Sequence, residues 1–437
     1  MSLLPVHSQH SANSQTVGSQ RWDTNYEWKT VTLLGLGFGL VGLDRWIISP
    51  LFPFMMKDLH LGYQDLGNIV GIMGITWGVF AAIMGGVSDR IGRRKILLAS
   101  IFIFSILSGF SGIATGLISL ILIRAMMGVS EGSFCPVSFA ATSEVSEPKR
   151  RGLNQGIQQC TFAFLGLGFG PIIATQLLAV VPSWRWVLWV VAIPGLIVGG
   201  LMYFVIRDSD ATQRKTKAPA TYAWRTIFHR RNIVLAMIAL LCAMSGVFVL
   251  SAMIPNYLID YLRLPAGQMG FVTAAIGFGG GLGQFGIPGL SDIFGRRVMA
   301  VLSFAGAAVF LWFFSRTGAH PAILFALLFV ISFFCLGLIS LLSGPIATES
   351  APAGLTSTTI GLVVGAGEIF GGGIAPAIAG YVAQHYGIQM ILYLALAGVV
   401  LGVIVCLFLQ ETAPRKMALS HKRSRQGLIA HEDELLV

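Results

Sequence analysis

The chain has 437 residues, of which 55% are hydrophobic and only 11% are charged. Soluble domains carry roughly 25% charged residues, so this composition excludes a water-soluble globular protein. The formal net charge is +10 at neutral pH, which is compatible with a nucleic-acid partner. The positions of the basic residues decide whether this interpretation holds.

Twelve apolar stretches follow one another along the chain. A helix needs about 20 apolar residues to cross the hydrocarbon core of a bilayer. Lipid offers the backbone no hydrogen-bond partner, so each stretch must be helical. The sequence therefore predicts an all-α membrane protein with twelve transmembrane helices. We place them near residues 31–56, 66–88, 95–113, 116–141, 153–180, 184–206, 231–258, 268–290, 298–315, 321–347, 356–382 and 388–409.

The polar segments divide the chain into domains. Residues 1–29 are polar and lack the apolar core of a signal peptide, so we predict a disordered cytoplasmic tail. The longest charged loop lies near the middle of the chain. We therefore expect one six-helix bundle over 30–206, a cytoplasmic linker over 207–230, a second six-helix bundle over 231–410 and a cytoplasmic tail over 411–437.

Lysine and arginine are distributed unevenly between the two sides of the predicted membrane. When the loops are assigned alternately, one side holds 23 of the 29 basic residues and includes both tails, the other holds 4, and 2 lie inside spans. This is the positive-inside pattern, which places both termini in the cytoplasm. The excess of basic over acidic residues thus reflects the topology of the chain in a lipid bilayer, and we expect no nucleic-acid partner.

The sequence contains no pattern typical of an enzyme. The eight histidines lie in loops or tails, and there is no nucleophile motif, phosphate-binding loop or cluster of metal ligands. The five cysteines lie within apolar spans without a CxxC motif, so we interpret them as small core residues. We expect no enzymatic activity, no metal and no cofactor.

The chain contains an internal repeat. GGVSDRIGRRKILL begins at Gly85, PGLSDIFGRRVMAV begins at Pro288, and Asp89 and Asp292 occupy the same place in the two copies. Each copy follows the second span of its half and precedes the third. Two six-span halves in parallel repeat are typical of transporters.

These repeated loops resemble the signature loop of the major facilitator superfamily, although the second copy has Ile293 where the first has Arg90. The resemblance implies the major facilitator fold and a gating role for the loop. Asp89 is expected to accept hydrogen bonds from arginines of the neighbouring half and to latch the cytoplasmic side. The alternative is that the basic residues only anchor the loop at lipid headgroups. The motif comprises Gly85, Asp89, Arg90, Gly92, Arg93 and Arg94, and Asp292, Gly295, Arg296 and Arg297.

Four charges interrupt the first and fourth spans. Asp44 and Arg45 are adjacent in the first span, and Arg124 and Glu131 lie seven residues apart on one face of the fourth. A charge inside the membrane costs about 2.5–3.5 kcal/mol on insertion scales, so we expect the four to compensate one another around a shared cavity. The alternative is a buried salt bridge with no transport role, which is an inefficient way to stabilise a fold.

The Asp-Arg pair of the first span and RxxxGxxEG of the fourth resemble the anion–cation symporter family of proton-coupled organic-anion transporters; spinster-type lipid transporters show a similar arrangement. The resemblance implies that Asp44 and Glu131 carry protons and that Arg124 contacts the substrate carboxylate. Arg45 is expected to contribute positive potential. Glu368 in the eleventh span departs from the pattern. It is a candidate third proton site, a cation site or a hydrogen-bond partner of a loosened backbone.

Weaker polar candidates lie in other spans. Gln159 and Tyr257 are our choices for additional substrate contacts, although a lone polar side chain in a bundle is more often an interhelical hydrogen bond. GLGFGP, which begins at Gly166, half-resembles the antiporter signature of drug exporters, but small-residue helix packing explains it as well.

The sequence as a whole predicts a secondary transporter of a bacterial inner membrane, expected to be a monomer. We expect it to couple the symport of a small organic anion, a sugar acid or an aromatic carboxylate, to protons by alternating access. A proton-driven exporter of drugs or amphiphiles is the first alternative, and a non-transporting membrane sensor is the second.

Overall fold

The structure, a computed structural model, describes residues 23–147, 149–207, 226–352, 355–413 and 416, apart from the side chains at 85, 86, 89, 90, 356 and 357. Within this part of the chain, twelve helical runs are long and apolar enough to cross a membrane. They coincide with the twelve predicted stretches, so the predicted fold class is confirmed.

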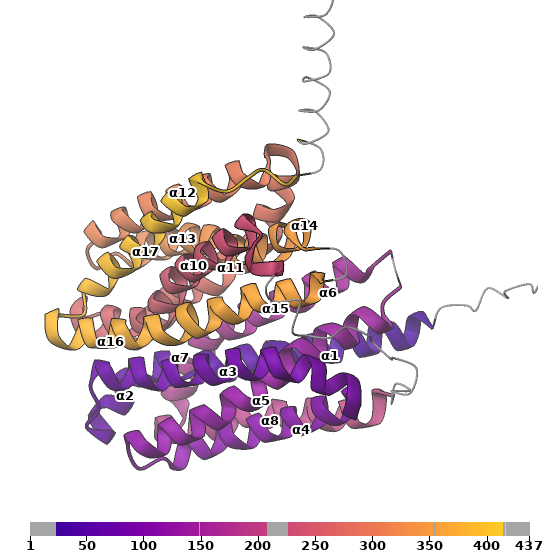
Figure 1. The fold of residues 1–437 in the computed structure, drawn as a ribbon. Helices are drawn as coiled ribbons and strands as arrows, with labels where there is room; N and C mark the ends of the chain where they lie inside the picture. Colours follow the sequence, from indigo (N-terminus) through magenta and orange to yellow (C-terminus); the bar gives the residue numbers. More distant parts are fainter. Residues whose placement is uncertain (1–22, 148, 208–225, 353–354, 414–415, 417–437) are drawn as a thin grey trace, which may run out of the picture.

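The helices form two halves that lie against each other, with the N-terminal half in the lower part of Figure 1 and the C-terminal half in the upper part. The N-terminal half consists of α1 (Thr24–Trp46), α2 (Ile48–Leu59), α3 (Tyr63–Ile91), α4 (Arg93–Phe110), η1 (Ser111–Ile113), α5 (Leu117–Val145), α6 (Arg151–Thr161), η2 (Phe162–Phe169), α7 (Gly170–Val180) and α8 (Trp184–Val205).

The C-terminal half repeats this plan and has π-helical segments at η4, η5 and η6, where the N-terminal half has one at η2 among the described residues. It consists of α10 (Arg231–Asn256), η4 (Tyr257–Tyr261), α11 (Ala266–Phe294), α12 (Arg296–Arg316), α13 (Pro321–Leu341), η5 (Leu342–Ile346), α14 (Ala347–Ser350), α15 (Thr356–Ala366), η6 (Gly367–Ile374), α16 (Ala375–Tyr386) and α17 (Met390–Leu407).

The first span is broken near its middle, between α1 and α2 at Ile47. Pro50 has no N–H to donate to the carbonyl of Trp46, and Pro53 removes a second bond one turn later. The break follows directly after Asp44 and Arg45. The local sequence thus places two charges where backbone carbonyls are available for side-chain donors.

Glycines bring the two halves into backbone contact on α3. A Cβ on Gly71 would lie 2.7 Å from the carbonyl oxygen of Gly373 in η6, and a Cβ on Gly67 would lie 2.5 Å from that of Pro376 in α16. Larger residues would separate the helices, because small residues are what allow close approach inside a membrane. The second span therefore packs directly on the eleventh.

The predicted disordered tail is wrong over residues 24–29, because α1 begins at Thr24. Glu27 is fully buried and accepts hydrogen bonds from the N–H of Glu147, from Arg150 Nη2 and from Asn154 Nδ2, at 3.0–3.2 Å. These tertiary contacts order a polar segment that hydropathy alone assigns to a tail. Residues 1–22 of that prediction lie outside the described residues.

Candidate functional site

Five charged side chains gather where the two halves meet, contributed by α1, α5 and η6. None of them is more than 6% exposed. Four are the charges predicted from the first and fourth spans, and the fifth is the glutamate of the eleventh span. The set is Asp44, Arg45, Arg124, Glu131 and Glu368.

The guanidinium of Arg124 binds the backbone at the break in the first span. Its Nη1 donates to the carbonyl oxygens of Asp44 at 2.8 Å and Arg45 at 3.4 Å. Its Nε and Nη2 are buried and have no hydrogen-bond partner among the described residues. Arg124 thus fixes the geometry of the break and keeps two donors for an incoming acceptor.

The carboxylate of Asp44 has a partner that sequence reasoning missed. Ser108 of α4 donates to Asp44 Oδ1 at 2.7 Å. Asp44 also lies close enough to Arg124 to interact electrostatically. A serine in an apolar span gives no signal of its own, so only the packing of α4 on α1 identifies Ser108.

Arg45 forms an ion pair across the interface between the halves. Its Nη2 lies 2.8 Å from Glu368 Oε2. The guanidinium carbon lies 5.5 Å from the ring of Trp46, 5.4 Å from that of Trp77 and 5.0 Å from that of Phe248, within the range of cation–π attraction. Arg45 therefore has an ion-pair partner outside the four original charges, and this partner lies 323 residues away.

Glu131 is the least satisfied member of the cluster. It is fully buried, and neither carboxyl oxygen has a hydrogen-bond partner among the described residues. It lies within electrostatic range of Asp44, Arg45 and Arg124. A buried carboxylate without donors is costly, so Glu131 has hydrogen-bonding capacity that the described residues do not use.

The glycine-rich segment η6 gives the ion pair the space that it needs. A Cβ on Gly372 would lie 2.6 Å from Glu368 Oε2 and 3.1 Å from Arg45 Nη2. On the opposite side, a Cβ on Gly78 of α3 would lie 3.2 Å from the Cβ of Glu368. The residues at positions 372 and 78, on either side of Glu368, must therefore be small.

Replacing Gly372 with alanine is expected to push Glu368 away from Arg45 and to reduce both transport and stability. Overpacking of a tight site typically costs about 1–3 kcal/mol. The matched control is Gly361→Ala on α15, where a Cβ would meet nothing within 4 Å. Uptake rates and thermal unfolding in detergent provide the measurements; equal behaviour of the two variants would contradict the packing argument.

Two predicted substrate contacts lie elsewhere. The ring of Tyr257 is 2% exposed and packs 5.2 Å from Tyr261 and 6.3 Å from Phe314 of α12 in the core of the C-terminal half. Its substrate role stays a prediction. Gln159 is half-buried, and no contact with the charged cluster is found among the described residues. Its substrate role stays a prediction.

The two signature loops share a backbone conformation, which supports the internal repeat. Gly92 has φ 101° and Gly295 has φ 103°, in the left-handed region that favours glycine. In each copy the arginine that follows this glycine forms an ion pair within its own half. The pairs are Arg93 with Glu144 at 2.6 Å and Arg296 with Glu349 at 2.8 Å.

The second signature copy forms contacts within its own half. Asp292 pairs with Arg296 at 2.7 Å, one turn along the chain. The backbone N–H groups of Arg296 and Arg297 donate to Glu411, just beyond the last span of the same half. Gating by this copy therefore stays a prediction. The first copy's Gly85, Asp89 and Arg90 are described only in their helical backbone, so gating there stays a prediction.

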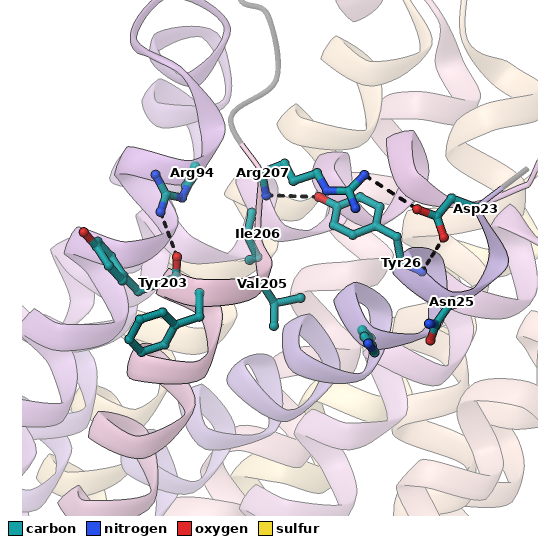
Figure 2. A pocket seen from close by; sticks show the side chains of 10 residues that line it. Asp23, Asn25, Tyr26, Arg94, Tyr203, Val205, Ile206 and Arg207 are labelled. Atoms are coloured by element: carbon teal, nitrogen blue, oxygen red, sulfur yellow. Dashed lines mark hydrogen bonds and ion pairs between the residues drawn. The ribbon is translucent and has the colours of Figure 1, made fainter.

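A pocket of about 550 Å³ lies at the end of the N-terminal half, where α1 begins and α8 ends (Figure 2). Arg94 of the signature loop donates to the carbonyl oxygen of Tyr203 at 2.7 Å in its wall, and the N–H of Arg207 donates to the hydroxyl of Tyr26 at 3.1 Å. Its lining includes none of the five buried charges. We therefore do not assign the transported molecule to it.

The fold and the buried cluster together define a membrane transport protein rather than an enzyme. Two pseudo-repeated six-helix halves enclose charges that would be too costly to bury for packing alone. The family model described as Major Facilitator Superfamily matches residues 34–364 and 236–433. The chain belongs to this superfamily and is a multi-pass membrane protein.

Relatives of this chain are named as transporters of organic acids or their lactones. It is 28% identical to a probable 4-methylmuconolactone transporter of Cupriavidus pinatubonensis, over 77% of this chain and 80% of that protein. It is 27% identical to the cis,cis-muconate transport protein of Acinetobacter baylyi, over 90% and 96%. Among solved structures, a bacterial homologue of the lysosomal transporter Spinster matches with a TM-score of 0.70 at 15% identity, covering 87% of this chain and 96% of that one. This last match supports the fold alone.

Proposed function

We propose that this protein carries a small organic anion across a bacterial inner membrane together with protons, with both of its termini in the cytoplasm. The observation that carries the proposal is the cluster of two arginines and three carboxylates, buried where the halves meet. The names of the muconate and methylmuconolactone transporters support a carboxylate as cargo.

The arginines provide the anion site. Arg124 has two unpaired donors, and Arg45 has an unpaired Nη1. A guanidinium binds a carboxylate through two parallel hydrogen bonds. Because water is excluded from the site, these charge-assisted bonds are stronger than they would be at the surface.

The carboxylates provide the proton sites. An apolar environment favours the neutral form of a carboxyl group, and a neighbouring guanidinium favours the ionised form. Asp44 has a hydrogen-bond donor in Ser108 and lies within electrostatic range of Arg124, whereas Glu131 has no hydrogen-bond partner among the described residues. Alternating access changes water exposure and the positions of the arginines, so the two acids bind and release protons at different stages.

The test is uptake of labelled cis,cis-muconate into proteoliposomes under an inward acid gradient. We expect accumulation above the external concentration, which a protonophore abolishes. Benzoate and a sugar acid compete as unlabelled probes and define the preferred carboxylate. Efflux of a lipophilic cation under the same gradient, without carboxylate uptake, would instead identify a drug exporter and contradict the proposal.

A further inference from the structure

The ion pair between Arg45 and Glu368 lies where an anionic cargo would bind. Only Nη2 of Arg45 is engaged by Glu368. Its Nη1 has no partner among the described residues, and the same is true of the indole nitrogens of Trp46 and Trp77. Buried donors without acceptors are rare because each loses its hydrogen bonds to water. Here three such donors lie close together, because one belongs to the guanidinium of Arg45 and the other two belong to indole rings beside it.

Few charges surround Glu368 apart from this arginine. Its neighbour on α3 is Gly78, and Trp77 of α3 lies by the guanidinium of Arg45. Gly372 and Phe248 lie beside the ion pair from η6 and α10. None of these carries a charge.

The acids and bases near the pair come from α1 and α5. Asp44 adjoins Arg45 in the chain, and Arg124 and Glu131 complete the cluster from α5. Cys135, also on α5, lies within electrostatic range of Glu368, but a thiol is uncharged at neutral pH. Arg45 is therefore the group that Glu368 depends on, since it is the only cation with which it forms an ion pair among the described residues.

We infer that Glu368 occupies the carboxylate subsite at Arg45 until the cargo arrives, and that the cargo's carboxylate displaces it. This inference rests on the proposed function. Once displaced, Glu368 would be an ionised carboxylate in an apolar interface without its cation. It therefore takes a proton from water on the open side of the transporter, and each displacement adds one proton to the bound complex.

The aromatic side chains specify the kind of carboxylate that this subsite takes. Trp46 and Phe248 lie 5.1 Å apart between ring centroids and come from opposite halves. With Trp77 they offer flat apolar surfaces and two indole N–H donors beside the guanidinium. A planar, unsaturated carboxylate can stack on these rings while accepting their hydrogen bonds. A bulky polyhydroxylated acid would leave its hydroxyl groups against apolar walls.

The experiment measures the affinity of purified protein for benzoate and for cis,cis-muconate between pH 6 and 8.5. In a linked equilibrium, one proton taken up with the ligand weakens binding about tenfold per pH unit, between the pH at which the group titrates in the free protein and the higher pH at which it titrates in the complex. We expect the slope of log Kd against pH to be lower by about one in Glu368→Gln than in the wild type, for both probes. Glu368→Asp, which keeps an acid, should retain the steeper slope. Equal slopes in the wild type and Glu368→Gln would overturn the inference.

A direct measurement keeps the test valid if Glu368→Gln does not fold. A pH-indicating dye in weak buffer reports protons taken up by the wild type on adding benzoate, and no uptake would overturn the inference. If the proposed function itself is wrong, the result differs, since neither probe would then bind at any pH.

A double-mutant cycle of Arg45→Gln and Glu368→Gln in thermal unfolding, without any carboxylate, tests the ion pair separately. No coupling between the two changes would also overturn the inference.

Discussion

Replacing Arg45 with glutamine is expected to abolish transport and to lower the free energy of unfolding by about 3–5 kcal/mol, the usual cost of removing one partner of a buried ion pair. The reason is that Glu368 would remain buried at the interface without its cation. The substitution also removes the guanidinium that three aromatic rings surround.

Thermal unfolding in detergent and uptake by proteoliposomes check this prediction together. The matched control is Arg316→Gln at the exposed end of α12, where the guanidinium lies 5.5 Å from the ring of Trp312. An exposed cation–π contact contributes roughly 0.5–1 kcal/mol, so this control should keep its transport. A stable, active Arg45→Gln protein would show that the ion pair serves neither the fold nor the cargo.

Replacing Asp44 with asparagine should abolish uphill accumulation and leave exchange of cargo across the membrane intact. Asparagine retains an oxygen that can accept the hydrogen bond from Ser108, now 2.7 Å from Asp44 Oδ1, but it cannot bind a proton. The binding site is therefore preserved while the coupling to the proton gradient is lost.

Two assays separate these effects. Counterflow of labelled cis,cis-muconate, with no gradient, measures exchange, and uptake under an inward acid gradient measures accumulation. Ser108→Ala is the control, because it removes the hydrogen bond at Asp44 but leaves the acid. It should accumulate cargo with an altered pH dependence. If Asp44→Asn accumulates cargo like the wild type, Asp44 does not lie on the proton path.

Several features of the site could be identified from the sequence because they stand out from their surroundings. Asp44, Arg45, Arg124 and Glu131 interrupt long apolar runs, and a charge in such a run must be paired or functional. Glu368 stands out in the same way. The structure brings all five together at the interface of the halves.

Their partners could not be identified in this way. Arg45 pairs with Glu368, although Asp44 is its neighbour in the chain. A side chain adjacent in sequence points to a different face of the helix, about 100° away. For the same reason, the sequence does not indicate that Tyr257 packs against Phe314 of α12. Hydropathy assigns Glu27 to a tail because the groups that bury it lie more than a hundred residues away.

The sequence by itself determined that the chain lies in a membrane, that it has twelve spans in two repeated halves, and which charges lie within the spans. These properties depend on local hydropathy and on motif spacing, which can be read without knowing how helices pack. Only the tertiary structure decided that Arg45 binds Glu368 across the interface, that Ser108 holds Asp44, and that Arg124 binds the broken backbone of the first span. Those contacts depend on which helix faces meet, because a helix that is apolar on every side carries no signal of its neighbours.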